Sequence, residues 1–300
     1  MERKHPKRLT FELFKEIAHQ GAHKFPSQVY FGNDYAIALD MVRPIAQITQ
    51  TGEPIRVDDM RIGFIKSGEA NVILNLIPHH LSVGTLVFLG SESIIQLKHK
   101  TEDFNLEGIA ITDDLLKVIM HGSIPQPLDQ RIQAFTFRLN ETDMQYFDRL
   151  ICLAADCNKY YKENTAMLFD LLSAIFHFFN HIYTSSQQYE LTEKTHEREV
   201  FDQFISLVNM TEGKERKLAY YADKLYLSQR YLGTIINNVS DITAKEWIDR
   251  AAIANIKVLL KHSNLSIKQI ADRMKFANDS FFCKYFKRLT GMTPAQYQRL

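Results

Sequence analysis

Residues 29–111 contain short apolar runs separated by turn residues, a pattern typical of a β-rich domain. The clearest part reads RIGFIK from Arg61, a turn at Ser67-Gly68-Glu69, NVILNLI, a second turn at Pro78-His79-His80, and LVFLG. Similar runs lie at 35–39, 94–97 and 104–111, and prolines 125 and 127 mark the end of the region. Strands at spacings of roughly 8–12 residues predict a sandwich or small barrel.

Helical periodicity begins near Asn140, and two amphipathic segments follow. The first carries apolar residues at 144, 147, 150, 151 and 154. The second, residues 166–183, is apolar on more than one face, so it is either deeply buried or shared with a partner subunit. Residues 186–197 are mainly polar and form the predicted linker between two domains, residues 1–185 and 198–300.

The last 100 residues contain an internal repeat with a period near 50. In each copy a short apolar helix is followed by a break, and then by a stripe at i, i+3, i+4 and i+7. The stripes are Leu232, Ile235, Ile236 and Val239 in the first copy, and Phe282, Tyr285, Phe286 and Leu289 in the second. Two short helices with a tight break between them are typical of a helix-turn-helix, and two matched copies strengthen that interpretation.

Capping residues support the same boundaries. Ser266 and Gln269 have the spacing of a capping box, and Ser228 and Asn278 are suitable N-caps for the second helix of each copy. Between the copies, Glu246–His262 is predicted to form one helix. Seventeen residues of helix span roughly 25 Å. A connector of that length can hold two readers about one DNA turn apart, roughly 34 Å, along one duplex.

The charge is distributed unevenly along the chain. The whole chain carries a formal net charge of +1, but residues 198–300 carry +7 and the preceding residues carry −6. This asymmetry indicates a polyanion-binding C-terminal segment, although a chance fluctuation of surface charge would also produce it. Three cysteines without metal-like spacing favour a reducing cytoplasm. The sequence contains no stretch of about 18 uninterrupted apolar residues, so it does not predict a membrane span.

Residues 266–298 resemble the signature of the AraC/XylS family of bacterial transcription regulators. The matching positions are Ile270-Ala271, Phe276, Ser280, Phe282, Phe286-Lys287, Gly291, Thr293-Pro294 and Tyr297, and weaker matches run back to about residue 200. Three departures stand out: Lys275 and Asp241 replace turn glycines, and Gly233-Thr234 replace larger polar residues on the first recognition helix.

The resemblance implies an α+β protein of two domains. Residues 1–185 would form a small β-barrel or sandwich, cupin-like in layout, with a helical pair that serves effector sensing or dimerisation. Residues 198–300 would form an all-α DNA-binding domain, in which a connecting helix joins two helix-turn-helix units. The expected protein is a cytoplasmic regulator of transcription, an activator or a repressor, which is not an enzyme and needs no cofactor or metal.

Base reading requires side chains near the start of each second helix, where they reach the major groove. In the first copy these are Gln229, Arg230 and Thr234. In the second copy the positions matching the family's base-contacting stretch are Asp279, Ser280 and Lys284. Phosphate contacts are expected from Lys287 and Arg288. Asp279 has an alternative role as a first-turn carboxylate that complements the helix dipole.

Double-stranded DNA is therefore the principal expected partner. A small-molecule effector, a second copy of the chain bound through the 141–185 helices, and RNA polymerase are further expected partners. The sequence does not distinguish a sensor from a regulator whose N-terminal domain only dimerises. A polar-lined cavity in the β region would favour the sensor, whereas an interior filled by side chains would favour the dimerisation module.

A metal-dependent cupin-type enzyme fused to a DNA-binding module is the remaining alternative, and the sequence argues against it. The strand region has no His-x-His, and no GxSxG, Walker A or GxGxxG string occurs. His177 and His181 have the i, i+4 spacing of a zinc-binding helix, but Phe178 takes the place of the general base, so both are expected to be core groups. The acid pairs Asp58-Asp59 and Asp113-Asp114 are interpreted as solvated loop residues.

Overall fold

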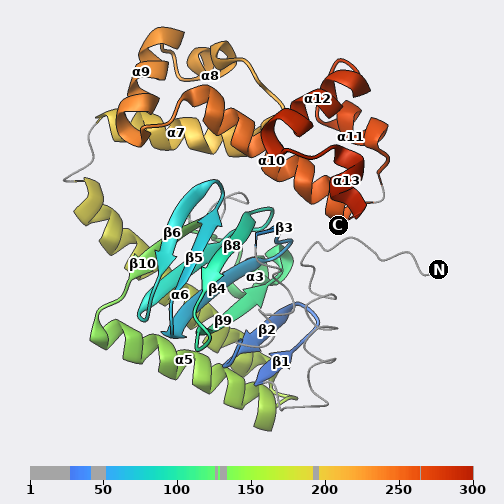
Figure 1. Ribbon diagram of the computed structural model, residues 1–300. Helices are drawn as coiled ribbons and strands as arrows, with labels where there is room; N and C mark the ends of the chain where they lie inside the picture. Colours follow the sequence, from blue (N-terminus) through green and yellow to red (C-terminus); the bar gives the residue numbers. More distant parts are fainter. Residues whose placement is uncertain are drawn as a thin grey trace. The chain divides into compact units, whose positions relative to one another are not determined.

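The computed structural model describes residues 28–41, 52–125, 128, 134–191, 196–263 and 265–299 (Figure 1). Among these, the residues within Arg8–Thr192 form one compact unit and those within Glu193–Leu300 form a second. The described strands all lie in the first unit, and the second is built from helices. The α+β class and the order of a β-rich region before a helical one are confirmed.

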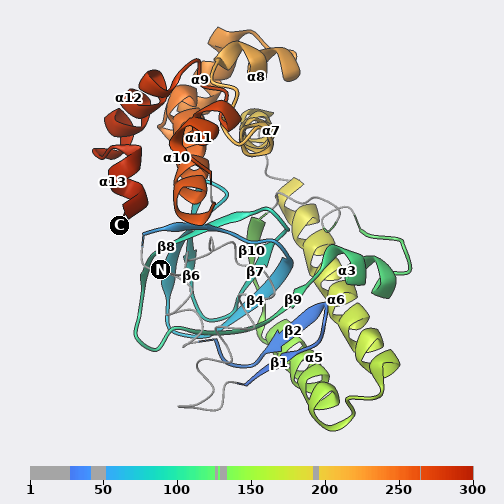
Figure 2. The same cartoon turned by 90° about the vertical axis from the view of Figure 1, so that its right-hand side faces the viewer.

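The N-terminal unit contains two antiparallel sheets, which face each other in Figure 2. Their orders are β1-β2-β9-β4-β7-β10 and β3-β8-β5-β6. The strands are β1 (Val29–Phe31), β2 (Tyr35–Ala38), β3 (Pro54–Arg56), β4 (Met60–Ser67), β5 (Ala70–Leu74), β6 (Ile77–Leu81), β7 (Thr85–Leu89), β8 (Ile94–Lys100), β9 (Asn105–Ile111) and β10 (Ala134–Arg138).

Strand β7, in the six-stranded sheet, shows why the sequence of a strand can be apolar at successive positions instead of alternating with polar residues. All five of its residues are buried. Because successive side chains of a strand point to opposite faces, Leu86 and Phe88 enter the core beneath the helices, whereas Val87 and Leu89 enter the core between the sheets. This sheet is therefore covered on both faces.

Three of the described helices cover the outer face of the six-stranded sheet: α3 (Asp113–Ile119), α5 (Glu141–Tyr160) and α6 (Thr165–Leu191) (Figure 2). Helix α5 begins where the Asn140 side chain accepts a 2.9 Å hydrogen bond from the Asp143 amide. Helix α6 buries residues of one face, among them Phe176 and Phe179, and the Phe179 ring stacks on Phe88 at 5.1 Å. The predicted helical pair is thus an integral layer of the N-terminal unit.

Two assignments made for α6 need qualification or correction. Residues Thr165–Ser185 are long and apolar enough to cross a membrane by length and composition, although the apolar face of α6 contributes to the core of this unit. His177 and His181 are exposed, so the expectation that they are core groups is wrong. Their i, i+4 spacing coincides with the outward face of α6, opposite Phe176 and Phe179.

The predicted strand boundaries also need correction. NVILNLI is not one strand, because the chain reverses at Asn75-Leu76 with φ values of 43° and 80°. Pro78-His79-His80 are part of strand β6 rather than a turn. The reversal is held by Asn75, whose Oδ1 accepts from the Ile94 amide at 2.8 Å. Proline is tolerated in β6 because β6 lies at the edge of its sheet.

Other differences come from long-range pairing. Strand β10 follows the prolines that were expected to end the β region, and it pairs with β7. Asp59 is buried and accepts from Arg61 at 2.8 Å, and Asp113-Asp114 open helix α3, so neither pair is a set of solvated loop residues. The segment predicted as a linker is partly helical, because α6 continues to Leu191 and α7 begins at His196.

The two sheets enclose a cavity of about 140 Å³. Its walls are apolar side chains from both sheets, including Val72, Leu89, Leu97 and Phe104. Arg61 is the one charged residue among the lining residues, and its guanidinium forms an ion pair with Asp59 at 2.7 Å. The interior is therefore neither polar-lined nor completely filled, a result that differs from both outcomes considered for the sequence.

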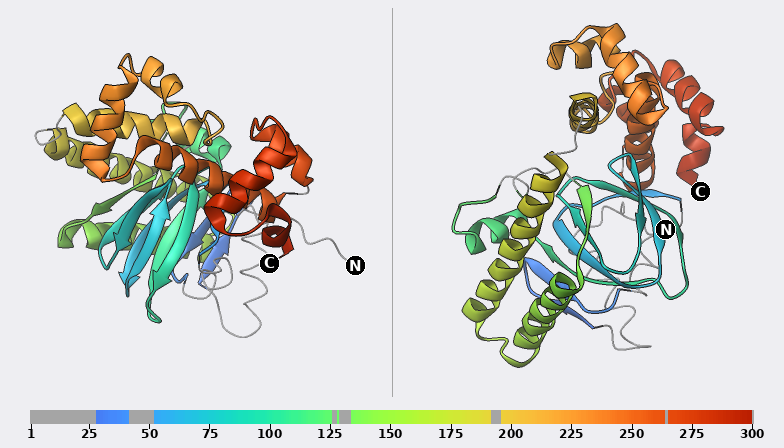
Figure 3. Two further views of the ribbon diagram at one scale, coloured as in Figure 1. Left: turned by 45° about the horizontal axis from the view of Figure 1, so that its top comes forward. Right: turned by 90° about the vertical axis from the view of Figure 1, so that its left-hand side faces the viewer.

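The C-terminal unit consists of seven described helices, which the left panel of Figure 3 shows in yellow, orange and red. They are α7 (His196–Met210), α8 (Leu218–Lys224), α9 (Gln229–Ser240), α10 (Ala244–His262), α11 (Ile267–Arg273), α12 (Asp279–Thr290) and α13 (Pro294–Arg299). The observed helices agree with both copies of the repeat and with the connecting helix.

Candidate nucleic-acid interface

The first helix-turn-helix consists of α8 and α9. The chain turns at Tyr226, which has a φ of 56°, and α9 begins after Ser228, whose hydroxyl accepts from the Tyr231 amide at 3.2 Å. Leu232, Ile235 and Ile236 are buried, so one face of α9 is used for packing. The expected cap and the expected apolar stripe are both confirmed through Ile236, and Val239 is half-buried.

The second unit, α11 and α12, repeats this arrangement. Ser266 and Gln269 form the predicted capping box, and the Asn278 side chain accepts from the Phe281 amide at 2.8 Å. Phe282, Tyr285 and Phe286 of α12 are buried, whereas Leu289, the fourth position of the predicted stripe, is 39% exposed. Gly291 ends the helix with a φ of 80°, and Pro294 begins α13. Glycine at the end of one helix and proline at the start of the next are used as expected.

Helix α10 joins the two units through 19 residues, which span roughly 28 Å. Thr243 caps it by accepting from the Glu246 amide at 3.2 Å. At its N-terminal end the Trp247 ring meets Phe201 of α7 at 5.7 Å, and further along Ile256 and Leu260 join the core of the second unit. The connector is thus packed against α7, which precedes the first copy, and against the second copy.

All eight residues expected at the interface are exposed, and the structure brings them to the outward faces of the two second helices. On α9 these are Gln229, Arg230 and Thr234, and on α12 they are Asp279, Ser280, Lys284, Lys287 and Arg288. The Thr234 hydroxyl donates to the Arg230 carbonyl at 3.0 Å, so in this structure the hydroxyl is engaged by its own helix. Asp279 lies in the first turn of α12, as its dipole role also requires.

The helical geometry adds a residue that the sequence reasoning missed. Asn237 is exposed and follows Arg230 by seven positions, so it shares the outward face of α9 with Arg230 and Thr234. In the repeat, Asn237 of the first copy is equivalent to Lys287 of the second copy, fifty positions later. The same period applied to the outward stripe, rather than only to the apolar one, would have found it.

The two outward faces differ in charge. Helix α12 exposes Lys284, Lys287 and Arg288, whereas the exposed cation of α9 is Arg230. The Arg288 guanidinium also lies 5.5 Å from the Tyr285 ring, a cation–π contact that orients it near the C-terminal end of α12. The second helix-turn-helix therefore exposes more positive charge for neutralising phosphates, whereas the first exposes mainly uncharged polar side chains.

Comparison with known proteins agrees with this geometry. Residues 221–300 match the protein family described as a helix-turn-helix domain. These residues cover the first copy from the buried Tyr221 onward, the connector and the complete second copy. The C-terminal part of the chain therefore carries a helix-turn-helix domain of the AraC type.

Among AraC-type relatives, the chain is 31% identical to regulatory protein PocR of Salmonella typhimurium over 83 residues, which are 28% of this chain and 27% of PocR. It is 24% identical to the transcriptional activator RhaR of Escherichia coli over 237 residues, covering 76% of this chain and 80% of RhaR. The chain thus spans about a quarter of PocR, and a similar share of the E. coli regulator YijO.

Solved structures give only weak likenesses. Wild-type ToxT from Vibrio cholerae with a bound unsaturated fatty acid has a TM-score of 0.38 at 15% identity, covering 89% of this chain and 95% of that one. The DNA-binding domain of AdpA in complex with a target DNA has a TM-score of 0.31 at 18% identity, covering 33% and 89%.

Proposed function

We propose that the protein is a cytoplasmic, sequence-specific DNA-binding regulator that activates transcription. The observation that carries this proposal is the pair of helix-turn-helix units, whose second helices α9 and α12 both bury an apolar stripe and expose a polar one. An isolated pair could serve other purposes, but two copies on one stiff connector suit two successive major grooves. The net charge of +7 in residues 198–300 supports the same function.

Each exposed residue has a role that follows from its chemistry. Arg230 can donate two hydrogen bonds to guanine, and Ser280 and Lys284 lie where the second helix would meet base edges. Asp279 can accept from cytosine, while Gln229 and Thr234 can contact bases or sugar-phosphate. Lys287 and Arg288, near the end of α12, would neutralise phosphates and so set the affinity rather than the sequence preference.

The test uses the full chain and duplexes selected by it from a random-sequence pool. Binding to a selected duplex should weaken as salt rises, because phosphate contacts release counterions. Lys287→Ala should lower the slope of log affinity against log salt by about one, whereas Arg230→Ala should cost about 1–3 kcal/mol and relax one base position. Arg198→Ala, on α7, is the matched control. Absence of binding at low salt would contradict the proposal.

The cavity of the N-terminal unit supports regulation by a small apolar effector. Its lining is apolar, and Arg61 is already paired with Asp59, so the site suits an uncharged molecule rather than an anion. The full chain should therefore enhance the fluorescence of the neutral dye N-phenyl-1-naphthylamine, and Val72→Phe, which fills the cavity, should abolish the signal. Equal signals from both proteins would favour the alternative in which this unit only dimerises.

Helix α5 supports the dimer. Tyr146, Leu153 and Tyr160 are 55%, 48% and 63% exposed and follow one another at intervals of seven, so they form a single apolar stripe. Leu153→Glu should convert the protein to a monomer in analytical ultracentrifugation, whereas Lys162→Glu, in the adjoining turn, should not. A wild-type monomer at high concentration would remove the dimer from the proposal. Recruitment of RNA polymerase would be the step that such a dimer performs on DNA.

A further inference from the structure

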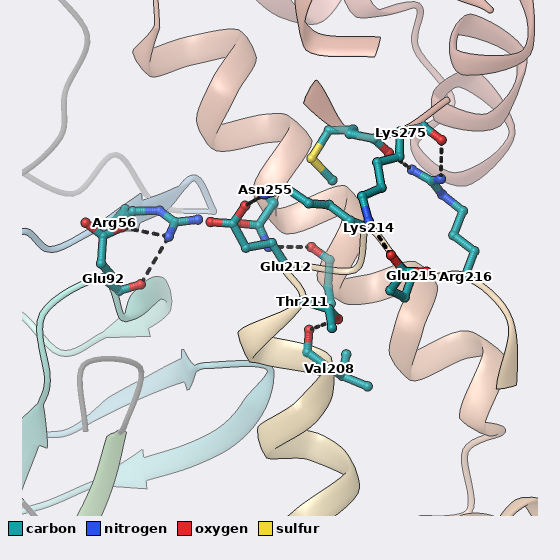
Figure 4. A network of polar contacts seen from close by, with 12 residues as sticks. Arg56, Glu92, Val208, Thr211, Glu212, Lys214, Glu215, Arg216, Asn255 and Lys275 are labelled. Carbon is teal, nitrogen blue, oxygen red and sulfur yellow. Dashed lines mark hydrogen bonds and ion pairs between the residues drawn. The ribbon is translucent and has the colours of Figure 1, made fainter. Parts of the chain in front are cut away.

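Arg216 connects the two helix-turn-helix units directly. It lies two residues before α8, the first helix of the first unit, yet its guanidinium reaches the turn of the second unit (Figure 4). There Nη2 donates to the Met274 carbonyl at 2.5 Å and Nη1 donates to the Lys275 carbonyl at 3.2 Å. Fifty-eight residues separate Arg216 from Met274, so this contact closes a long loop.

The guanidinium also stacks on the second unit. Its central carbon lies 3.6 Å from the centroid of the Phe276 ring and 5.6 Å from that of Tyr285. Both rings belong to the core beneath α12. A planar cation that stacks on aromatic rings and donates from its edge has a fixed orientation, which lysine cannot reproduce.

The position of the two carbonyls explains why a cation is favoured there. Met274 is the C-cap of α11, and Lys275 is the following turn residue. Carbonyls at a helix C-terminus lack intrahelical partners and carry partial negative charge. Arg216 therefore caps α11, in the second helix-turn-helix, from the segment just before α8, the first helix of the first helix-turn-helix.

A second contact acts in parallel. Glu215 and Lys275 form an ion pair at 2.5 Å (Figure 4). Lys275 has a φ of 55°, where glycine is usually favoured, and the ion pair gives a reason for a side chain at this position. This departure from the family pattern therefore coincides with the contact between the units.

The segment that carries Arg216 is itself anchored to the first unit. The Glu215 carbonyl accepts from the Tyr221 hydroxyl at 2.7 Å, and that hydroxyl lies 2.8 Å from the hydroxyl of Thr211 (Figure 4 shows Glu215 and Thr211). Tyr221 is completely buried, and its ring meets Phe204 edge-on. The segment that carries Arg216 is thus fixed to the buried core next to α8 and is not a free loop.

We propose that Arg216 is a positioning residue, which fixes the spacing and orientation of the two helix-turn-helix units so that α9 and α12 act as one rigid reader. The consequence for DNA rests on the proposed DNA-binding function, whereas the mechanical coupling does not. Without Arg216, the two helix-turn-helix units would keep α10 with its packing and the Glu215–Lys275 ion pair, and bending at the connector would vary the distance between the two recognition helices.

The coupling is measured first without DNA. Spin labels are placed on the full chain at exposed positions of α9 and α11, as Asn238→Cys and Asp272→Cys, after replacement of the three native cysteines. We expect one narrow distance distribution in the parent protein and a broad one in Arg216→Ala and Arg216→Lys. Arg250→Ala, an exposed arginine of α10, is the control and should stay narrow. A narrow distribution in both Arg216 variants would overturn the proposal.

The second readout uses a duplex selected by the wild-type protein and a shortened duplex that retains one half-site. Arg216→Lys should bind the full duplex about 10- to 100-fold more weakly, because one binding event no longer presents the second helix correctly. Its affinity for the half-site should be unchanged. An equal loss on both duplexes would point to misfolding and contradict a positioning role. Failure of the wild type to select any duplex would refute the proposed function and leave the distance measurement intact.

Discussion

The hydroxyl of Tyr285 donates a 2.7 Å hydrogen bond to Oδ1 of Asp249, and both side chains are buried. Tyr285 lies on α12 and Asp249 on α10, so the bond joins the second recognition helix to the connecting helix. The other carboxylate oxygen of Asp249 lies 3.6 Å from the ammonium group of Lys245. Burial, together with the neighbouring Asp249 carboxylate, raises the pKa of Tyr285, so the hydroxyl keeps its proton.

Tyr285→Phe should destabilise the C-terminal unit by about 1–3 kcal/mol, because the buried Asp249 carboxylate loses its hydrogen-bond donor. Trp247 is the single tryptophan of the chain and lies in this unit, so its fluorescence during urea unfolding reports the change. Tyr226→Phe is the matched control, since Tyr226 is 94% exposed. Equal unfolding midpoints for the two variants would show that the bond contributes nothing.

Asp241→Gly and Lys275→Gly should have different effects although both positions have a φ of 55°. Glycine adopts this conformation without steric cost, so Asp241→Gly should raise the free energy of unfolding by about 0.5–1 kcal/mol. Lys275→Gly should give no such gain, because it also removes the ion pair with Glu215. Trp247 fluorescence again measures both, and equal gains would mean that the ion pair is energetically silent.

Gly63 and Gly108 face each other on β4 and β9, but they should respond differently to alanine. A Cβ at Gly108 would lie 2.2 Å from the Ile62 carbonyl oxygen, so the strands would have to separate. A Cβ at Gly63 meets Leu106 at 3.5 Å, an ordinary contact. Gly108→Ala should therefore lower the unfolding free energy by more than about 2 kcal/mol, and Gly63→Ala by less than about 0.5. Thermal unfolding followed by circular dichroism distinguishes them.

Glu107 should make the N-terminal unit less stable as pH rises towards neutrality. Its carboxyl group is buried on β9, facing Lys66 of β4 and Asp148 and Cys152 of α5. Burial raises the pKa of Glu107 to about 7, although Lys66, 3.6 Å away, favours the charged form. Between the ordinary pKa of 4.5 and about 7, the folded chain binds the extra proton, so the free energy of unfolding falls with increasing pH.

Glu107→Gln should remove this dependence. We compare the free energy of unfolding of Glu107→Gln with that of the wild type at each pH. This difference should favour the variant by on the order of 1–2 kcal/mol more at pH 8 than at pH 5. Urea unfolding followed by far-ultraviolet circular dichroism at both pH values measures the effect, with the exposed Glu163→Gln as control. A wild type whose stability is constant between pH 5 and 8 would contradict the assignment.

The C-terminal helices could be predicted because their signals are local. Ser228, Ser266 and Asn278 act on amides three residues away, and each was found at the cap it was assigned. The β region was harder to predict. The turn at Asn75-Leu76 has no glycine, and it is held by a contact with Ile94, nineteen residues later. A window of neighbouring residues does not contain that information.

The candidate interface shows the same division. Its exposed residues lie where the helical period of the sequence puts them, and Asn237 was missed only because the outward stripe was not followed. The exposure of His177 and His181, by contrast, depended on which face of α6 meets the sheet, and an apolar helix with two possible faces does not determine this by itself.

The amino-acid sequence alone thus determined two capped helix-turn-helix units, the helix between them and a separate β-rich region, because periodicity and caps act within one or two turns of chain. Only the tertiary structure decided the apolar cavity with its paired Arg61, the buried carboxyl of Glu107 and the contact of Arg216 with Met274 and Lys275. These features arise from desolvation and from contacts between residues far apart in sequence, which form only when the chain packs.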